Sequence, residues 1–186
     1  MARTPSKMLA LGTKAPDFQL LDTVSDQVLT LMDVKGEKGT VVMFICNHCP
    51  FVVHVNPMIS KLGKEYQDKE IGFVAISSND IVNYPQDAPH LMKEKAQEEG
   101  YTFPYLFDET QEVAHAYDAA CTPDFYLFDA KMELVYRGQL DDSRPGNGLP
   151  LTGNDLRAAM DALLSGEEID SNQKPSIGCN IKWTNT

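Results

Sequence analysis

The chain has 186 residues, of which 42% are hydrophobic and 23% charged, and its formal net charge is -11. This length and composition are typical of one globular domain. The negative charge would repel phosphate backbones and anionic lipid, so we expect neither nucleic acid nor a membrane as a partner. The longest uninterrupted apolar run, Val41 to Cys46, is also far shorter than the ~20 residues that span a bilayer.

The N-terminal segment lacks the pattern of a secretory signal. Arg3 and Lys7 precede an apolar stretch, Met8 to Leu11, that is shorter than the ~7 to 15 residues such a signal needs. We therefore expect a cytoplasmic protein, in which most thiols stay reduced. Four cysteines are too few for a disulfide scaffold, so their placement has to be explained by chemistry or by packing.

The first half of the chain predicts alternating strands and helices. Short alternating patterns at 15–20 and 28–31 predict a β-hairpin. The apolar run 41–45 is typical of a central strand covered on both faces, and it ends at Cys46. From Cys49 onward, apolar residues recur at intervals of three and four, which predicts a helix.

The pattern continues with a second buried strand at 71–76 and a helix that Asp87 caps. A short helix at 111–117 leads to Pro123 and then to a hairpin of strands at 124–128 and 133–137. A last helix ends near Gly166 and is followed by a polar tail. This order predicts an α/β fold with helices on both faces of the sheet.

Three short stretches carry a resemblance to a known family. They are Gly12-Thr13-Lys14-Ala15-Pro16-Asp17-Phe18, Cys46-Asn47-His48-Cys49-Pro50 and Thr122-Pro123. The chain resembles the thioredoxin superfamily, and within it the redoxin branch, a peroxiredoxin-like (AhpC/TSA-type) subgroup with a C-x-x-C motif. The resemblance implies a thioredoxin-like fold, in which a central mixed β-sheet is flanked by helices, with an N-terminal β-hairpin and a C-terminal tail.

We expect residues 1–186 to form a single thioredoxin-like (redoxin) domain, with a core at about 11–165 and a C-terminal extension at 167–186. The resemblance also implies that Pro123 is cis and that the backbone of Thr122 pairs with a substrate peptide. The partners would be disulfides or thiols of proteins or small molecules, and we expect no cofactor and no resident metal.

The C-x-x-C motif predicts a thiol:disulfide oxidoreductase. A thiolate is the attacking species, and a helix N-terminus stabilises a thiolate. With Cys46 at the junction of strand and helix, we expect Cys46 to attack a disulfide and Cys49 to resolve the mixed disulfide. His48 would stabilise the thiolate, which makes such a couple more oxidising.

A thiol-dependent peroxidase is one alternative, with Cys49 as the peroxidatic cysteine and peroxides as substrates. The peroxiredoxin motif Pro-x-x-x-Thr-x-x-Cys is not matched, because Val42 and Cys46 stand at its Pro and Thr places. Its arginine has no obvious counterpart. However, Cys179 and Trp183 reproduce the Cys-x-x-x-Trp spacing of typical two-cysteine peroxiredoxins, so Cys179 is either a resolving thiol or a structural tail thiol.

A metal-binding module of the same fold is the other alternative. Cys46, Cys49 and Cys121, together with His48, offer soft ligands for copper or zinc. The chain has no second C-x-x-C pair, which a zinc site would favour. Cys121, two residues before Pro123, either approaches the C-x-x-C pair as an accessory thiol or is a packed loop thiol.

Overall fold

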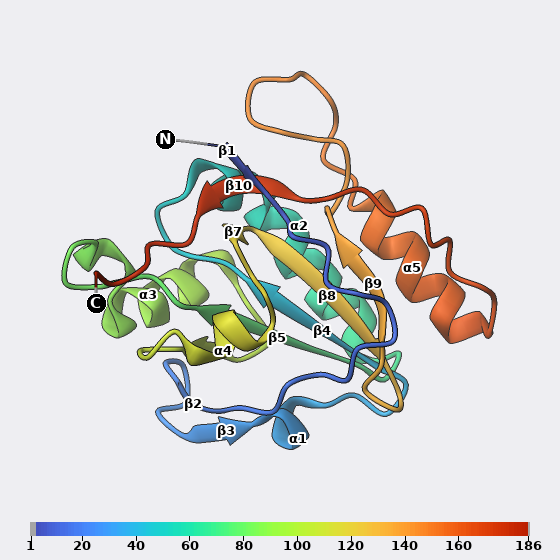
Figure 1. Ribbon diagram of the computed structural model, residues 1–186, viewed down its shortest axis with the longest axis horizontal. Coiled ribbons are helices and arrows are strands. Elements are labelled where there is room, and N and C mark those ends of the chain that lie inside the picture. Colours follow the sequence, from blue (N-terminus) through green and yellow to red (C-terminus); the bar gives the residue numbers. More distant parts are fainter. Residues whose placement is uncertain (1–2, 186) are drawn as a thin grey trace.

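The computed structural model describes residues 3–185, and its strands form two sheets (Figure 1). The larger sheet has the strand order β3-β2-β6-β5-β4-β8-β9. Its members are β2 (Gln19–Asp22), β3 (Val28–Thr30), β4 (Gly39–Phe44), β5 (Ile71–Ser77), β6 (Tyr105–Phe107), β8 (Asp124–Asp129) and β9 (Leu134–Gly138). The smaller sheet has the order β1-β10-β7, formed by β1 (Arg3–Pro5), β7 (Cys121–Thr122) and β10 (Ile177–Asn180).

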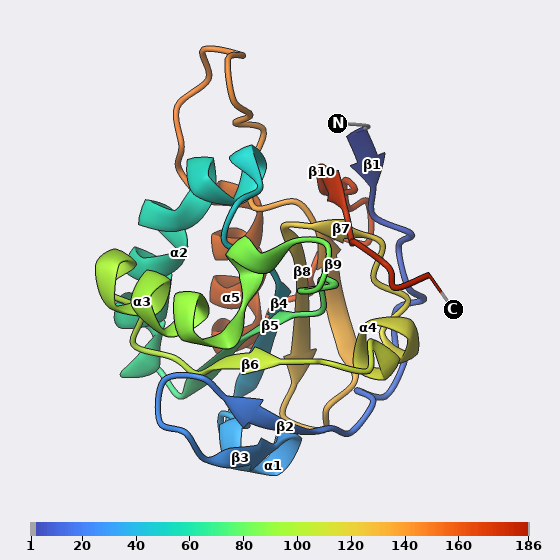
Figure 2. The same ribbon diagram turned by 90° about the vertical axis from the view of Figure 1, so that its left-hand side faces the viewer.

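The helices lie on both faces of the larger sheet. They are α1 (Leu31–Val34), α2 (Pro50–Gln67), α3 (Pro89–Glu99), α4 (Glu112–Ala116) and α5 (Asn154–Ser165), with a 3-10 turn, η1 (Pro85–Asp87). Buried residues of α2, α3 and α5 join one core cluster, and those of α1 and α4 join the other. Figure 2 shows α2, α3 and α5 on one side of the sheet and α4 on the other. The predicted layer arrangement is confirmed.

The central strand β4 lies between β5 and β8 and leads into the C-x-x-C loop. All of its residues are buried, and it pairs in parallel with β5 and antiparallel with β8. Val41 and Met43 face the first core cluster, while Val42 and Phe44 face the second. Because neighbouring side chains of a strand point to opposite faces, an apolar run without alternation is what a doubly covered strand requires.

The predicted hairpins and helices are present. β2 pairs antiparallel with β3, and β8 with β9. The last helix ends at Ser165, and Gly166 follows in the left-handed conformation that favours glycine. One detail was wrong: Ala88, not Asp87, is the N-cap of α3. The Asp87 carboxylate points instead to the loop before α2.

The segment after Gly166, expected to be a polar tail, returns across the molecule. Its strand β10 lies between β1 and β7, antiparallel to both (Figure 1). Neither β1 nor β10 was predicted from the sequence, because both are short and their pairing partners are distant in the chain. The end of the chain therefore contributes to the layer that covers the C-terminal end of β4.

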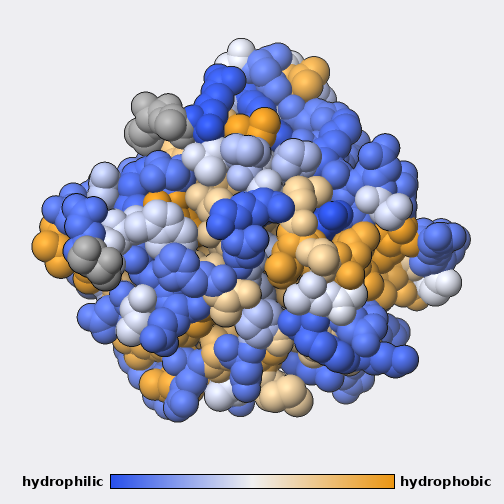
Figure 3. All heavy atoms as spheres, viewed as in Figure 1, coloured by the Kyte–Doolittle hydropathy of each residue, from blue (hydrophilic) through white to orange (hydrophobic). Residues whose placement is uncertain are grey.

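Figure 3 shows how hydrophilic and apolar residues are distributed on one face of the molecule. The face in Figure 3 is mostly hydrophilic, with an apolar group on the right, over α5 and the chain after it. Ala158, Ala162 and Ile169 line a hollow there. No helix within residues 3–185 combines the length and the apolar character needed to cross a membrane.

A buried carboxyl group joins the two sheets, and its titration provides a test. Burial raises the pKa of Asp124 to about 7, although hydrogen bonds from Ser6, Tyr126 and the Phe125 backbone act in the opposite direction. Between its ordinary value of 3.8 and about 7, the folded protein keeps a proton that the unfolded chain has lost. The contribution of Asp124 to stability is thus present at low pH and is lost as the pH rises through this window.

We therefore expect Asp124→Asn to flatten the dependence of the unfolding free energy on pH between about pH 4 and pH 7, by up to ~1.4 kcal/mol per pH unit. Urea unfolding across this range measures the slope. Asp68→Asn, which removes an exposed carboxyl group, serves as the control. Equal slopes in wild type and Asp124→Asn would show that Asp124 does not titrate in this way.

Candidate functional site

The loop between β4 and α2 is held by a buried carboxylate. Asn47 N donates to Asp87 Oδ1 at 2.8 Å, and Asn47 Nδ2 donates to the Gln86 carbonyl at 3.0 Å. Asn79 Nδ2 donates to Asp87 Oδ2 at 2.8 Å. Asp87 is completely buried. The carboxylate partner of the Asn47 N–H holds this loop, which bends at Asn47 and His48 and does not join the helix.

The helix consequently begins after the second cysteine. Cys49 is the N-cap of α2, and Pro50 occupies the first helical turn, where a missing N–H costs nothing. Val52 N and Val53 N both donate to the Cys49 carbonyl at 3.0 Å. The expectation that Cys46 lies at the helix N-terminus is therefore wrong, and Cys49 has that position.

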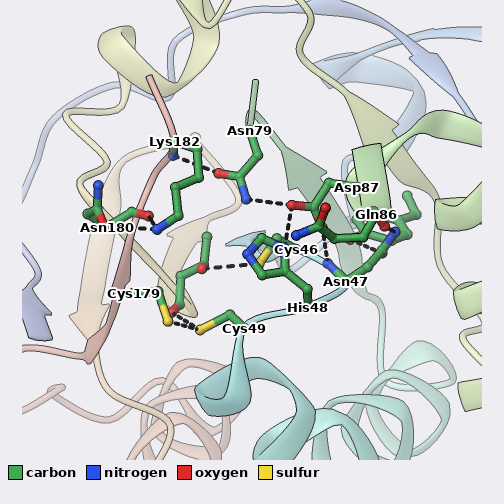
Figure 4. A network of polar contacts seen from close by, with 12 residues as sticks. Cys46, Asn47, His48, Cys49, Asn79, Gln86, Asp87, Cys179, Asn180 and Lys182 are labelled. Carbon is green, nitrogen blue, oxygen red and sulfur yellow. Dashed lines mark hydrogen bonds and ion pairs between the residues drawn. The ribbon is translucent and has the colours of Figure 1, made fainter. Parts of the chain in front are cut away.

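Cys46, Cys49 and Cys179 lie close together (Figure 4), and Thr122 contacts the first two. Cys49 Sγ lies 2.7 Å from Cys179 Sγ and 3.4 Å from the Thr122 carbonyl oxygen. Cys46 Sγ lies 3.5 Å from Thr122 Oγ1. The exposed fraction is 2% for Cys46 and Cys179 and 0% for Cys49. The structure thus brings Cys179, expected either in a tail or at the site, directly to the C-x-x-C pair.

The pKa values of these thiols diverge. A hydrogen bond from Cys46 is the largest cause that lowers the pKa of Cys49 to about 5, and a bond from Cys179 adds to it. The same bond to Cys49 raises the pKa of Cys46 well above its ordinary value, as do burial and the negative charge of Asp87. Burial, then the bond to Cys49, raises the pKa of Cys179 to about 12.

These contacts favour the charged form of Cys49 over that of Cys46 or Cys179. In its thiol form Cys49 donates to the Thr122 carbonyl, whereas the thiolate accepts hydrogen bonds from Cys46 and Cys179. The sequence predicts the attacking thiolate on Cys46, whereas the N-cap position of Cys49 and the hydrogen bonds from two thiols favour the thiolate form of Cys49. The role of each cysteine stays a prediction.

His48 lies beside the carboxylate that holds the loop. His48 Nδ1 is 2.6 Å from Asp87 Oδ2, a distance suited to an ion pair when the imidazole is protonated. The contact is an ion pair and not a hydrogen bond, and His48 Nδ1 has no hydrogen-bond partner within residues 3–185. The ring stacks on Tyr84 with centroids 5.9 Å apart. The effect of His48 on the thiols stays a prediction.

The same residues form a possible metal-ligand set. One atom each from Cys46, His48 and Asp87 lie within 4.8 Å of one another. Sulfur, imidazole and carboxylate donors suit zinc. This set differs from the predicted one, because Cys121 Sγ is directed to the Pro123 carbonyl at 3.8 Å, and burial raises its pKa. Asp87 belongs to the structural set, whereas Cys49 and Cys121, which the sequence had included, do not.

The Thr122-Pro123 peptide bond is cis, as the resemblance implied. Thr122 lies in β7, which pairs antiparallel with β10, and Cys179 is the residue opposite Thr122. The backbone edge expected to receive a substrate peptide is thus occupied by a strand of the same chain.

Sequence reasoning missed three residues of this network. Asp87 holds the loop, Asn79 holds Asp87, and Lys182 N donates to Asn79 Oδ1 at 2.9 Å (Figure 4). No local pattern marks them, because they lie on separate segments that meet only in the folded chain. Cys179 had a signal, the Cys-x-x-x-Trp spacing.

Known proteins share both the sequence pattern and the architecture. The chain is 29% identical over 140 residues to the thiol-disulfide oxidoreductase ResA of Geobacillus thermodenitrificans, which covers 74% of this chain and 75% of that protein. A solved structure of an uncharacterized conserved protein from Geobacillus kaustophilus is 57% identical, with a TM-score of 0.98, and covers 100% of this chain and 98% of that one.

The thioredoxin domain of a thiol-disulfide oxidoreductase from Bacteroides vulgatus is 21% identical, with a TM-score of 0.59 over 73% of this chain and 90% of that domain. This likeness confirms the thioredoxin-like fold. The AhpC/TSA family profile matches residues 11–137. The match spans more than half of the sequence, and the chain belongs to the AhpC/TSA family.

Proposed function

We propose that the protein is a thiol:disulfide oxidoreductase whose working couple is Cys46 and Cys49. The observation that carries this proposal is the arrangement of the pair: both sulfurs contact Thr122, the residue before cis-Pro123, and Cys49 is the N-cap of α2, where its pKa is lowered. A thiolate at neutral pH beside a second thiol is what dithiol–disulfide exchange requires. The curated relative named thiol-disulfide oxidoreductase ResA supports the same reaction class.

The reduced protein would act in two exchanges. The Cys49 thiolate attacks one sulfur of a substrate disulfide, forms a mixed disulfide and releases the other sulfur as a thiolate. Cys46 then gives up its proton and attacks Cys49 Sγ, which forms the Cys46–Cys49 disulfide and expels the second substrate sulfur. Two electrons pass from the protein to the substrate disulfide, and its two released sulfurs take up protons.

This assignment exchanges the roles that the sequence suggested for the two cysteines. Thr122 contacts both sulfurs, through its hydroxyl and its carbonyl, so it would position the couple as well as a substrate. Cis-Pro123 shapes the loop that presents Thr122. His48 remains a candidate for tuning the couple through its contact with Asp87.

The substrates would be disulfides or thiols of proteins or small molecules. Because both sulfurs are buried, a substrate reaches them only when the covering segments move. The cytoplasmic location that we infer from the sequence stays a prediction.

Single substitutions test the order of attack. Cys46→Ser and Cys49→Ser should each lower turnover of insulin or of a glutathione mixed disulfide by on the order of 10³-fold or more. Cys46→Ser combined with Cys179→Ser should also trap a mixed disulfide on Cys49, because both thiols that could attack Cys49 Sγ are gone. Cys121→Ser is the control and should keep most of its activity. Trapping on Cys46 in the Cys49→Ser variant would restore the order suggested by the sequence.

The titration of Cys49 tests the electrostatics. Because the pKa of Cys49 is lowered to about 5, one thiolate should be present above that pH, visible as ultraviolet absorbance of the reduced protein. Cys46→Ala removes the main donor and should raise this pKa, whereas Cys46→Ser keeps a hydroxyl donor and should raise it less. A single step near the ordinary cysteine value in the wild type would contradict the assignment.

A peroxidase is the second candidate function, favoured by the Cys49 thiolate with Cys179 at 2.7 Å. The thiolate would attack a peroxide to give a sulfenic acid and an alcohol or water, and Cys179 would condense with it and release water. An antioxidant role would follow. The arginines weigh against it: the Arg137 guanidinium donates to the Leu9 carbonyl and to Gln173, and that of Arg144 to Gln139 and nearby carbonyls.

Peroxide consumption by the reduced protein distinguishes this candidate. If Cys49 is peroxidatic, turnover should be lost in Cys49→Ser, and Cys46→Ser combined with Cys179→Ser should accumulate the sulfenic acid, because neither thiol that could condense with it remains. Cys121→Ser is again the matched control. Turnover that survives Cys49→Ser would eliminate the peroxidase.

A further inference from the structure

The strand β10 occupies the place that a substrate peptide would take. It runs antiparallel to β7, and Cys179 stands opposite Thr122, the residue before cis-Pro123. Addition of an extended segment to a strand edge is a general mode of peptide recognition. Here the added segment also brings a sulfur to 2.7 Å from Cys49 Sγ, only ~0.7 Å more than a disulfide bond.

A glycine makes this close approach possible. A Cβ atom added at Gly178 would lie 1.9 Å from the Thr122 carbonyl oxygen and 2.6 Å from its carbonyl carbon. Both atoms belong to the backbone and cannot move aside without shifting β7. Gly178 therefore allows β10 to contact Thr122 and sets the distance between Cys179 and Cys49.

Hydrogen bonds anchor β10 on both sides of Cys179. On one side, Ser176 N donates to Ser6 Oγ at 2.8 Å, and Ser176 Oγ donates to the Pro123 carbonyl. On the other, Lys182 N donates to Asn79, which holds the Asp87 carboxylate under the redox loop. The position of Cys179 is thus linked to the same network that positions Cys46 and Cys49 (Figure 4).

We propose that β10 is a built-in substrate strand: Cys179 exchanges with the Cys46–Cys49 disulfide and stores the oxidation as a Cys49–Cys179 disulfide. The inference rests on the proposed function, because the Cys46–Cys49 disulfide must form first. Cys179, as a thiolate, attacks Cys49 Sγ; the Cys49–Cys179 bond forms and the Cys46–Cys49 bond breaks. Cys46 leaves as a thiolate and takes up the proton that Cys179 gave up, so no external oxidant or reductant is consumed.

The exchange would act as a latch: the disulfide would hold β10 on the edge of β7, where a substrate peptide would pair with Thr122. While Cys49 is bonded to Cys179, β10 is tied covalently beside Thr122 and no external peptide can pair there. Attack by Cys46 on Cys49 reverses the step and frees the strand. This differs from resolution of a sulfenic acid, because equilibration with a dithiol and its disulfide is sufficient and no peroxide is needed.

Disulfide mapping by mass spectrometry tests the latch. Wild-type protein is equilibrated in buffers of reduced and oxidised dithiothreitol, quenched with acid, alkylated and digested. We expect both the Cys46–Cys49 and the Cys49–Cys179 bonds. Gly178→Ala should lower the ratio of the second to the first by about tenfold or more, since overpacking against backbone forces β10 away. Gly146→Ala strains a left-handed backbone position, as any alanine there would, but its added Cβ meets nothing within 4 Å, so this control for backbone strain alone should keep the ratio.

Cys179→Ser provides a second readout if Gly178→Ala does not fold. Because this variant loses one oxidised species, the midpoint of its oxidation should shift to a more oxidising potential than in the wild type. A wild type that forms only Cys46–Cys49, or an unchanged ratio in Gly178→Ala, or an unchanged midpoint in Cys179→Ser, would overturn the latch and leave the proposed function standing. Absence of any Cys46–Cys49 bond would instead overturn the proposed function.

Discussion

The site depends on the hydrogen bonds that the buried carboxylate of Asp87 accepts. This carboxylate accepts the Asn47 N–H and the Asn79 amide, and it lies 2.6 Å from His48 Nδ1. A buried carboxylate is costly unless such donors surround it. It holds the bent loop after β4 outside the helix, so the helix starts at Pro50 and Cys49 is its N-cap.

The electrostatic pattern follows from that geometry. A helix N-terminus and two thiol donors converge on Cys49, while Cys46 faces the negative charge of Asp87, so the two cysteines are driven toward opposite protonation states. A couple in which one sulfur is ionised and its neighbour protonated is poised for exchange. Thr122 touches both sulfurs and connects the couple to the edge where strands pair.

The C-terminal segment completes the same network. Its strand pairs with both β1 and β7, its Lys182 backbone reaches Asn79, and its Cys179 reaches Cys49. The two ends of the chain therefore enclose a centre whose sulfurs are almost fully covered. A substrate reaches these sulfurs only when the covering segments move, whereas exposed thiols would need no such movement.

The sequence by itself determined the local features: the doubly buried strand at 41–45, the apolar stripe of α2, both hairpins and the C-x-x-C motif. Short-range hydrophobic periodicity and residue type are enough to predict these features. The resemblance added the cis bond at Pro123. Only the tertiary structure decided that Asp87 leaves its expected cap, that α2 begins after Cys49, and that Cys179 reaches the site. The contacts of Asp87 with Asn47 and of Cys179 with Cys49 join residues 40 and 130 positions apart, and local sequence patterns do not encode such contacts.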